Sequence, residues 1–283
     1  KSLNVSFFGG EPLLYFKKAV LPILKYASDV CIEKGIKLYS NFTTNGVLLS
    51  EEVIQQLNAL RFAKLPTFQI TLDGNDKYHN SIRVGLDKKP TYETILNHIV
   101  YALQHGNEAF VRFNYTHENI LSFLDVLDDF KKRGLDKYPQ TLSIKFEHVW
   151  QDAQFLEQTK PKVEKVRDAY AAAGFRVGTD DIHFRHVCYA DSPNHFVINY
   201  NGDVFKCTAR DFKPDIREGV LDNKGELIMD ECFSRRMSIR YANPSCLECK
   251  ILPLCNGGCT QNKMDSKLLI GCYRQMDEQQ KDE

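Results

Sequence analysis

The chain contains 283 residues, of which 43% are hydrophobic and 26% are charged, values typical of a globular protein. Lysine plus arginine equals aspartate plus glutamate at 37 each, so the bulk charge does not indicate nucleic acid or an anionic membrane as a partner. No apolar run approaches the roughly 20 residues of a membrane span, so no membrane segment is predicted.

Strand-like and helix-like segments alternate along the first 174 residues. Short apolar runs predict strands at 3–8, 36–42, 67–72, 109–115 and 142–149. Apolar residues spaced three and four apart predict helices at 12–34, 50–60, 92–104, 119–133 and 163–173. Alternation of this kind is typical of an α/β protein with a parallel sheet or barrel. Because the first strand follows Lys1 with almost no lead-in, we expect the natural N-terminus to lie further upstream.

Unusual residues occupy the loops that follow the predicted strands. In parallel α/β architectures these loops share one edge of the sheet, and binding sites form there. The loop residues are Gly9-Gly10-Glu11-Pro12, Thr44-Asn45-Gly46, Asp73-Gly74 and Asn114. We therefore predict a site at this edge.

The sequence changes character near residue 175, where helical periodicity weakens and cysteines become frequent. Residues 195–199 and 204–206 flank Asn201-Gly202, which predicts a β-hairpin. We expect a domain boundary between residues 175 and 185, with domains at 1–178 and 179–283.

Seven of the nine cysteines form an ordered series in this second part. The series is Cys188, Cys207, Cys246, Cys249, Cys255, Cys259 and Cys272. Tight gaps interrupted by proline and glycine favour thiolates around a metal centre, because an apolar core has no use for such spacing. An odd total argues against a disulfide framework, so we expect a reducing, cytoplasmic setting. Cys31 falls in an amphipathic helix and is predicted to be a core residue, and Cys232 lies outside the series.

The series resembles the SPASM domain, the C-terminal extension of many radical S-adenosylmethionine (SAM) enzymes. The matching order is Cys188, thirteen residues, Gly202, four residues, Cys207, then gaps of two, five and three from Cys246 to Cys259, then Cys272. The first half is also similar to these enzymes. Gly9-Gly10-Glu11-Pro12 after a strand resembles their SAM-binding motif, and Thr71-Leu72-Asp73-Gly74 followed by His79 and Arg83 resembles a later segment of the same barrel.

The resemblance implies a partial (β/α)6 barrel that binds SAM and one [4Fe–4S] cluster, followed by a SPASM domain with two auxiliary clusters. Residues implied to contact SAM are Gly9, Gly10, Glu11, Pro12, Thr71, Asp73, Arg83 and Asn114. Residues implied to hold the second auxiliary cluster are Cys246, Cys249, Cys255 and Cys272, and those implied for the first are Cys188, Cys207 and Cys259. Implied partners are a precursor peptide or protein substrate and an electron donor such as flavodoxin or ferredoxin.

Three features depart from the family pattern. The Cys-x-x-x-Cys-x-x-Cys loop of the radical-generating cluster, with its strand, is absent from the given residues, and we expect it upstream. Some relatives, including sulfatase maturases, supply a fourth cysteine before Cys188, where this sequence has His183 and His186 instead. A histidine or carboxylate could replace that ligand, or one iron could stay open to substrate. Sulfatase maturases also carry an aspartate where this chain has Thr208.

The favoured hypothesis is a radical SAM enzyme that modifies a ribosomally synthesised precursor peptide or another protein. Alternatives are a catalytically degenerate SAM- or peptide-binding relative, a protein oxidase of the sulfatase-maturase type, and a zinc-stabilised interaction module. Simpler roles also stay open for single residues: Thr71 and Asp73 could cap a helix, Arg83 could form a surface ion pair, and Asn114 could satisfy backbone at a strand end.

Overall fold

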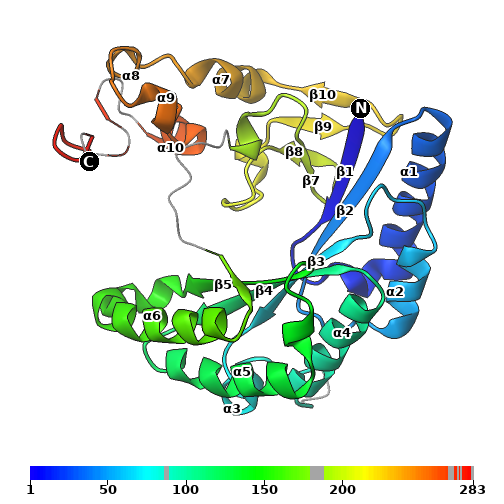
Figure 1. Ribbon diagram of the computed structural model, residues 1–283. Helices are drawn as coiled ribbons and strands as arrows, with labels where there is room; N and C mark the ends of the chain where they lie inside the picture. Colours follow the sequence, from blue (N-terminus) through cyan, green and yellow to red (C-terminus); the bar gives the residue numbers. More distant parts are fainter. Residues whose placement is uncertain (86–88, 179–187, 267–270, 273, 275, 282–283) are drawn as a thin grey trace. The chain divides into compact units, whose positions relative to one another are not determined.

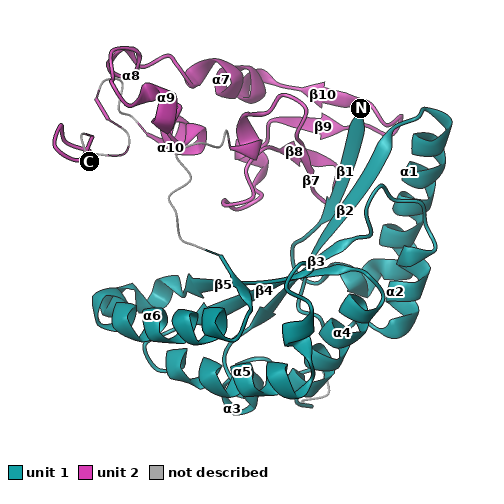
Figure 2. Ribbon diagram, in the orientation of Figure 1, with its two compact units in different colours: residues 1–180 teal, residues 181–283 magenta. Residues whose placement is uncertain are grey.

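The structure is a computed structural model that describes residues 1–85, 89–178, 188–266, 271–272, 274 and 276–281. The chain divides into two compact units, residues 1–180 and 181–283 (Figure 2). Within the described residues, no helix is both long enough and apolar enough to cross a membrane.

Unit 1 contains a parallel six-stranded sheet whose strands follow one another in chain order. The strands are β1 (Ser2–Phe7), β2 (Lys37–Thr44), β3 (Thr67–Leu72), β4 (Glu108–Tyr115), β5 (Leu142–His148) and β6 (Arg176–Val177). All neighbouring pairs are parallel, which confirms the predicted α/β class. The sequence did not predict β6, which is only two residues long.

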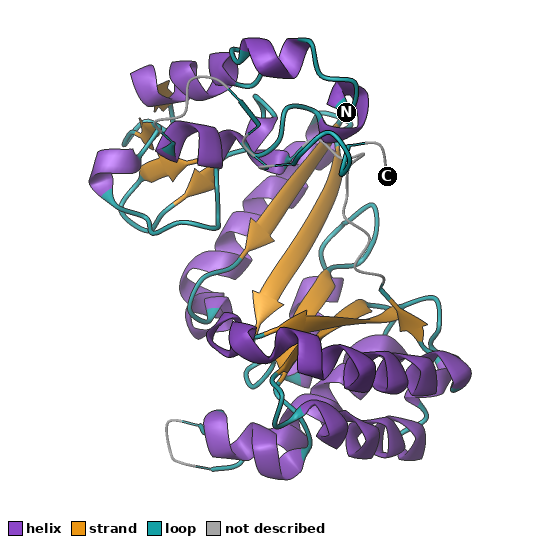
Figure 3. Cartoon of the chain, turned by 90° about the vertical axis from the view of Figure 1, so that its left-hand side faces the viewer, coloured by secondary structure: helices purple, strands orange, loops and turns teal. Residues whose placement is uncertain are grey.

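The helices of unit 1 cover one face of this sheet (Figures 1 and 3). The α-helices are α1 (Leu21–Glu33), α2 (Glu51–Asn58), α3 (Asp76–Ile82), α4 (Tyr92–Gln104), α5 (Phe123–Lys132) and α6 (Leu156–Ala172). Shorter turns occur at Pro12–Tyr15, Phe16–Val20, Ile120–Ser122, Leu135–Lys137 and Trp150–Phe155. The helix predicted at 12–34 therefore begins as a 3-10 turn and a π turn before α1.

Strand alternation decides which side chains enter the core. Phe68, Ile70 and Leu72 of β3 are completely buried against the helices, whereas the residues between them are partly exposed on the opposite face. β4 and β5 show the same alternation. The uncovered face of the sheet therefore carries polar residues.

Unit 2 is built around an antiparallel sheet with the order β10-β9-β8-β7. Its strands are β7 (Val197–Ile198), β8 (Asp203–Phe205), β9 (Gly219–Leu221) and β10 (Leu227–Met229). Its helices are α7 (Glu231–Ile239), α8 (Pro244–Leu247), α9 (Leu252–Cys255) and α10 (Thr260–Asp265), and short turns lie at Tyr189–Asp191 and Pro214–Ile216. β7 and β8 form the predicted hairpin.

Gly74, which follows β3, is closely surrounded by other side chains of unit 1. Its φ of +110° is a conformation that side chains rarely adopt, and an added Cβ would lie 2.7 Å from Ser122 Oγ and 2.9 Å from Tyr78 Cβ. We expect Gly74→Ala to lower the free energy of unfolding by more than about 2 kcal/mol in urea titrations. Gly35→Ala is the control, because Gly35 also has positive φ but open space around it, and should cost about 1 kcal/mol. Equal losses would contradict the steric explanation.

Candidate functional site

The loop after β1 exposes its main chain. Gly9 and Gly10 have φ of +89° and +53°, in the left-handed region that favours glycine. A Cβ at either position would meet nothing within 4 Å, so a ligand has access to the backbone there. Pro12 then begins a 3-10 turn, where its missing N–H leaves no bond unmade.

The Glu11 carboxylate joins the loops after β1 and β2. Its Oε1 accepts the main-chain N–H of Leu13 at 3.0 Å and the hydroxyl of Thr44 at 2.8 Å. Its Oε2 accepts the N–H of Asn45 at 2.7 Å. A carboxylate offers about four acceptor positions, so one position on Oε2 is left for a ligand donor.

Asp73 and Arg83, predicted separately as ligand contacts, form an ion pair with each other. The Asp73 N–H donates to His79 Nδ1 at 3.3 Å, and His79 Nε2 lies 3.2 Å from the Thr91 hydroxyl. Because Nδ1 accepts, Nε2 must carry the proton, and the imidazole is neutral. The helix-capping alternative for Asp73 is wrong, since Asn75 caps α3 by accepting the Tyr78 N–H.

Arg112 and Asn114 occupy the uncovered face of β4 near its carboxyl end. Arg112 Nε and Asn114 Oδ1 are both buried without a hydrogen-bond partner. The strand register places Arg112 between Thr71 of β3 and Lys145 of β5. Unpaired buried polar atoms cost about 1–3 kcal/mol each, so this pair favours a polar ligand. Arg112 was not predicted from the sequence, although its position two residues before Asn114 on an alternating strand was a usable signal.

Asn119 fixes the loop after β4. Its side-chain amide donates to the carbonyl oxygens of Asp73 and Asn114, at 3.1 and 3.2 Å, and its Oδ1 accepts the Thr116 N–H at 2.7 Å. Asn119 begins the helix predicted at 119–133, but its side chain makes no capping bond there. The side chain instead connects the ends of β3 and β4.

A second polar cluster follows β4 and β5. The carboxylate of Asp152, which is 7% exposed, accepts the main-chain N–H of His117 at 2.6 Å. It also contacts His117 Nδ1 at 2.5 Å and His148 Nε2 at 3.1 Å. Burial alone would raise the Asp152 pKa, but these hydrogen bonds outweigh burial and lower it. This cluster was not predicted from the sequence.

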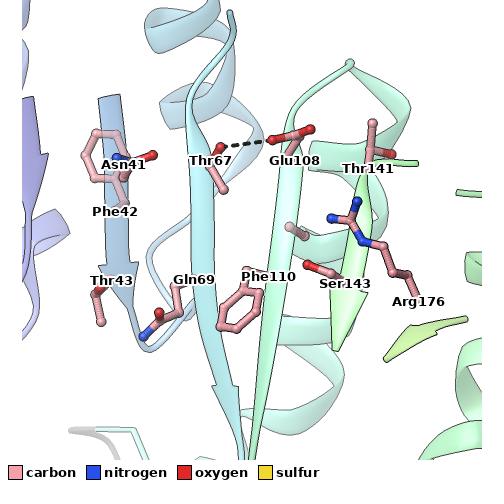
Figure 4. Close-up of a pocket in the computed structure, with 11 residues that line it drawn as sticks. Asn41, Phe42, Thr43, Thr67, Gln69, Glu108, Phe110, Thr141, Ser143 and Arg176 are labelled. Atoms are coloured by element: carbon pink, nitrogen blue, oxygen red, sulfur yellow. Dashed lines mark hydrogen bonds between the residues drawn. The ribbon is translucent and has the colours of Figure 1, made fainter. Parts of the chain in front are cut away.

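A cavity of about 310 Å³ lies toward the amino ends of the strands (Figure 4). Thr67 and Glu108, the first residues of β3 and β4, form a hydrogen bond of 3.3 Å at its rim, and Arg176 of β6 also lines it. The predicted loop residues do not line this cavity. We place the candidate site at the carboxyl ends instead, where Glu11, Arg112 and Asn114 lie.

Four cysteines of unit 2 line one cavity of about 230 Å³. They are Cys246, Cys249, Cys255 and Cys272. Burial raises the pKa of Cys246, the Lys263 ammonium lowers it, and the other three thiols raise it. Among the described residues, no group of three or more histidine, cysteine, aspartate or glutamate side chains is placed to hold a single metal ion. The donor groups that line this cavity are mainly thiols.

The other three cysteines of the series lie on segments that hydrogen bonds join. They are Cys188, Cys207 and Cys259. The hydroxyl of Thr260, next to Cys259, donates to Asp191 at 2.5 Å, and the Tyr189 hydroxyl contacts that of Thr208. Burial raises the pKa of Cys188, and Asp191 and the two other thiols act in the same direction. Their donor set therefore suits a second thiolate site.

Solved structures define the class of this fold. Native anSMEcpe with bound AdoMet superposes with a TM-score of 0.62 at 18% identity, over 96% of this chain and 80% of that one. Streptococcus suis SuiB bound to S-adenosylmethionine gives a TM-score of 0.60 at 20% identity, over 96% and 66%. The chain thus has the fold of radical SAM enzymes with a SPASM domain, which confirms the predicted fold class and resemblance.

Curated proteins with similar sequences have names consistent with this class of fold. The chain is 24% identical to the cysteine-type anaerobic sulfatase-maturating enzyme of Clostridium perfringens, over 96% of this chain and 78% of the enzyme. It is 21% identical to the enzyme of the same description from Clostridium novyi, over 93% and 74%. No protein-family model matches the chain.

The buried His79 gives the site a pH-dependent stability. Burial lowers its pKa from 6.5 to about 4, an effect that Asp73 opposes and Arg83 reinforces. The unfolded chain therefore binds the proton first, and stability falls as pH decreases from about 6.5 toward 4, by up to about 3 kcal/mol. We expect His79→Gln to flatten this part of the curve in urea titrations between pH 7 and pH 4. The exposed His105→Gln variant is the control, and an equally steep curve in His79→Gln would contradict the assignment.

Proposed function

We propose that this protein is a radical SAM enzyme that modifies a peptide or protein, with a ribosomally synthesised precursor peptide as the favoured substrate. The observation that carries the proposal is the coexistence of two features in one chain. The Glu11 loop lies at the carboxyl edge of a parallel sheet, and four cysteines line one cavity in unit 2. The relatives support it, since SuiB has been solved bound to precursor peptide SuiA and anSMEcpe with a peptide.

The carboxyl-edge residues have the chemistry needed to bind SAM. When bound and reduced at the radical-generating cluster, SAM supplies a 5′-deoxyadenosyl radical that removes a hydrogen atom from the substrate. The remaining acceptor position of Glu11 would take the SAM amino group, beside the exposed backbone of Gly9 and Gly10. Arg112, with its unpartnered Nε, suits the carboxylate better than Arg83, whose Nε already pairs with Asp73.

The remaining polar groups would orient the rest of the molecule. Asn114 Oδ1 is a free acceptor for a hydroxyl or amino donor, and Thr71 lies beside Arg112 in the strand register. Asp73 is held in place by Arg83 and Asn119, so it presents a fixed carboxylate at the same edge. We propose that the ribose lies among these groups.

Unit 2 would hold two auxiliary [4Fe–4S] clusters. Cys246, Cys249, Cys255 and Cys272 would bind one, and the second would take the remaining three cysteines of the series. A flavodoxin or ferredoxin would deliver the electron to the radical-generating cluster.

Sulfatase maturation is the activity named for the curated relatives. At the position after Cys207, the hydroxyl of Thr208 contacts Tyr189. A threonine hydroxyl cannot accept a substrate proton as a carboxylate does near neutral pH. This residue favours a peptide modification other than the protein oxidation of a sulfatase maturase.

The proposed reaction is tested with the full-length gene product purified without oxygen. We expect a brown protein that, after reduction with dithionite, converts SAM to methionine and 5′-deoxyadenosine, measured by liquid chromatography and mass spectrometry. Residues 1–283 alone should form neither product, since they lack the expected cysteine triad. A colourless zinc protein would support the interaction-module hypothesis. A brown full-length protein without turnover would support the degenerate relative.

The Arg112 assignment is tested by SAM affinity. Arg112→Ala should raise the SAM dissociation constant about 10- to 100-fold, because a charge-assisted hydrogen bond contributes about 1.5–3 kcal/mol. Isothermal titration calorimetry on the full-length protein measures it. Arg176→Ala, at the amino end of the same sheet, is the matched control. Equal affinities for the two variants would exclude Arg112 from the site.

A further inference from the structure

The three-cysteine group of unit 2 lacks a fourth ligand among its own thiols. A [4Fe–4S] cluster has four irons and is held most often by four cysteines. Cys232, the remaining thiol of unit 2, lies outside the cysteine series, and the charged groups near it are Glu218, Asp230, Arg236 and Arg235. The fourth ligand is then a side chain outside the series, or one iron stays open.

The register of the β7–β8 hairpin, continued beyond its last pair, would bring His195 opposite Cys207. That last pair is Val197 with Phe205, two steps away from His195 and Cys207. The ladder hydrogen bonds end before this point, but the two segments stay together. The Lys206 ammonium lies 4.9 Å from the centre of the Phe196 ring and bonds the His195 carbonyl oxygen. Side chains at opposed positions of such a pair lie on one face, with Cβ atoms about 5 Å apart.

The segment of Cys188 also contacts His195. The ring of Tyr189, the next residue, lies 4.8 Å from the imidazole, centre to centre. The Tyr189 hydroxyl in turn contacts Thr208, the residue after Cys207. His195 therefore lies beside both segments that carry these cysteines.

The imidazole nitrogen at this position has no partner. His195 Nε2 is buried and makes no hydrogen bond. Leaving a buried polar atom unsatisfied costs about 1–3 kcal/mol, and a neutral imidazole nitrogen is a common ligand for iron. An iron atom would satisfy it.

We propose that His195 Nε2 is the fourth ligand of the auxiliary cluster held by Cys188, Cys207 and Cys259. This inference rests on the proposed function, since it requires a cluster at that site. A neutral imidazole in place of a thiolate makes the cluster less negative, which raises its reduction potential. Fully ligated irons also leave no position for a substrate thiolate, so the site would carry electrons rather than bind the peptide.

The experiment uses the full-length protein purified without oxygen, with pulsed electron paramagnetic resonance on the reduced clusters. We expect the wild type to show nitrogen coupling from an imidazole, and His195→Ala to lose it. His195→Cys should keep the wild-type iron content and shift one midpoint potential downward. The exposed His105→Ala variant controls for histidine replacement, and circular dichroism verifies folding. If His195→Ala fails to fold, His195→Cys decides the question by the same loss of nitrogen coupling.

Iron content distinguishes a wrong assignment of the cluster from a wrong assignment of His195 as its ligand. Cys207→Ala should lose about four irons, one cluster's worth. If it loses none, the proposed cluster at this site is wrong, and the His195 assignment falls with it. If it loses that iron but nitrogen coupling persists in His195→Ala and His195→Cys, only His195 is excluded. Loss of the coupling in His183→Ala or His186→Ala, which lie outside the described residues, would then identify another ligand.

Discussion

Among the described residues of unit 1, the helices pack on one face of the parallel sheet, and the rest of this unit depends on that constraint. A parallel sheet is normally buried on both faces, so its strands read as continuous apolar runs. Here β3, β4 and β5 alternate instead, with Phe113 completely buried beside the partly exposed Arg112 and Asn114. The uncovered face therefore has the composition of a binding surface. The loops at its carboxyl edge need a firm mutual arrangement, which Glu11 and Asn119 supply.

Strong local patterns were predictable from the sequence. The predicted ends of β3 and α4 coincide with the observed Thr67–Leu72 and Tyr92–Gln104, because clear periodicity and turn residues bound both elements. Cys31 was predicted as a core residue and is 3% exposed. The two-residue β6 was missed, since a strand that short has no periodic pattern and forms only because β5 offers a free edge.

Pairings between distant side chains were not predictable. The sequence marks Asp73 and Arg83 as unusual, but nothing local shows that they bind each other. Asp152 lies 35 residues from His117, and only the packing of two successive loops brings them together. Arg112 was overlooked because an arginine in a strand usually faces solvent, and the missing partner of its Nε is visible only in three dimensions.

Unit 2 has a different source of stability. In its described residues the fully buried apolar side chains are few: Ala190, Val197, Val204 and Phe205. Small domains with so little apolar core commonly rely on metals or other cross-links. In the sequence, the cysteine spacing indicated a metal-stabilised domain, whereas the apolar pattern indicated almost nothing about how this unit is stabilised.

Buried cations in unit 2 fit the same explanation. Lys263 is 1% exposed and its ammonium donates to the Arg240 carbonyl oxygen. Burial lowers the Lys263 pKa, and the thiols of Cys246 and Cys255 oppose that shift. An apolar interior would exclude such an ammonium, but thiolates of an iron–sulfur cluster would provide the negative charge that holds it. On the proposed assignment, the cluster and Lys263 stabilise each other. Loss of iron would therefore remove negative charge that stabilises the buried Lys263 ammonium.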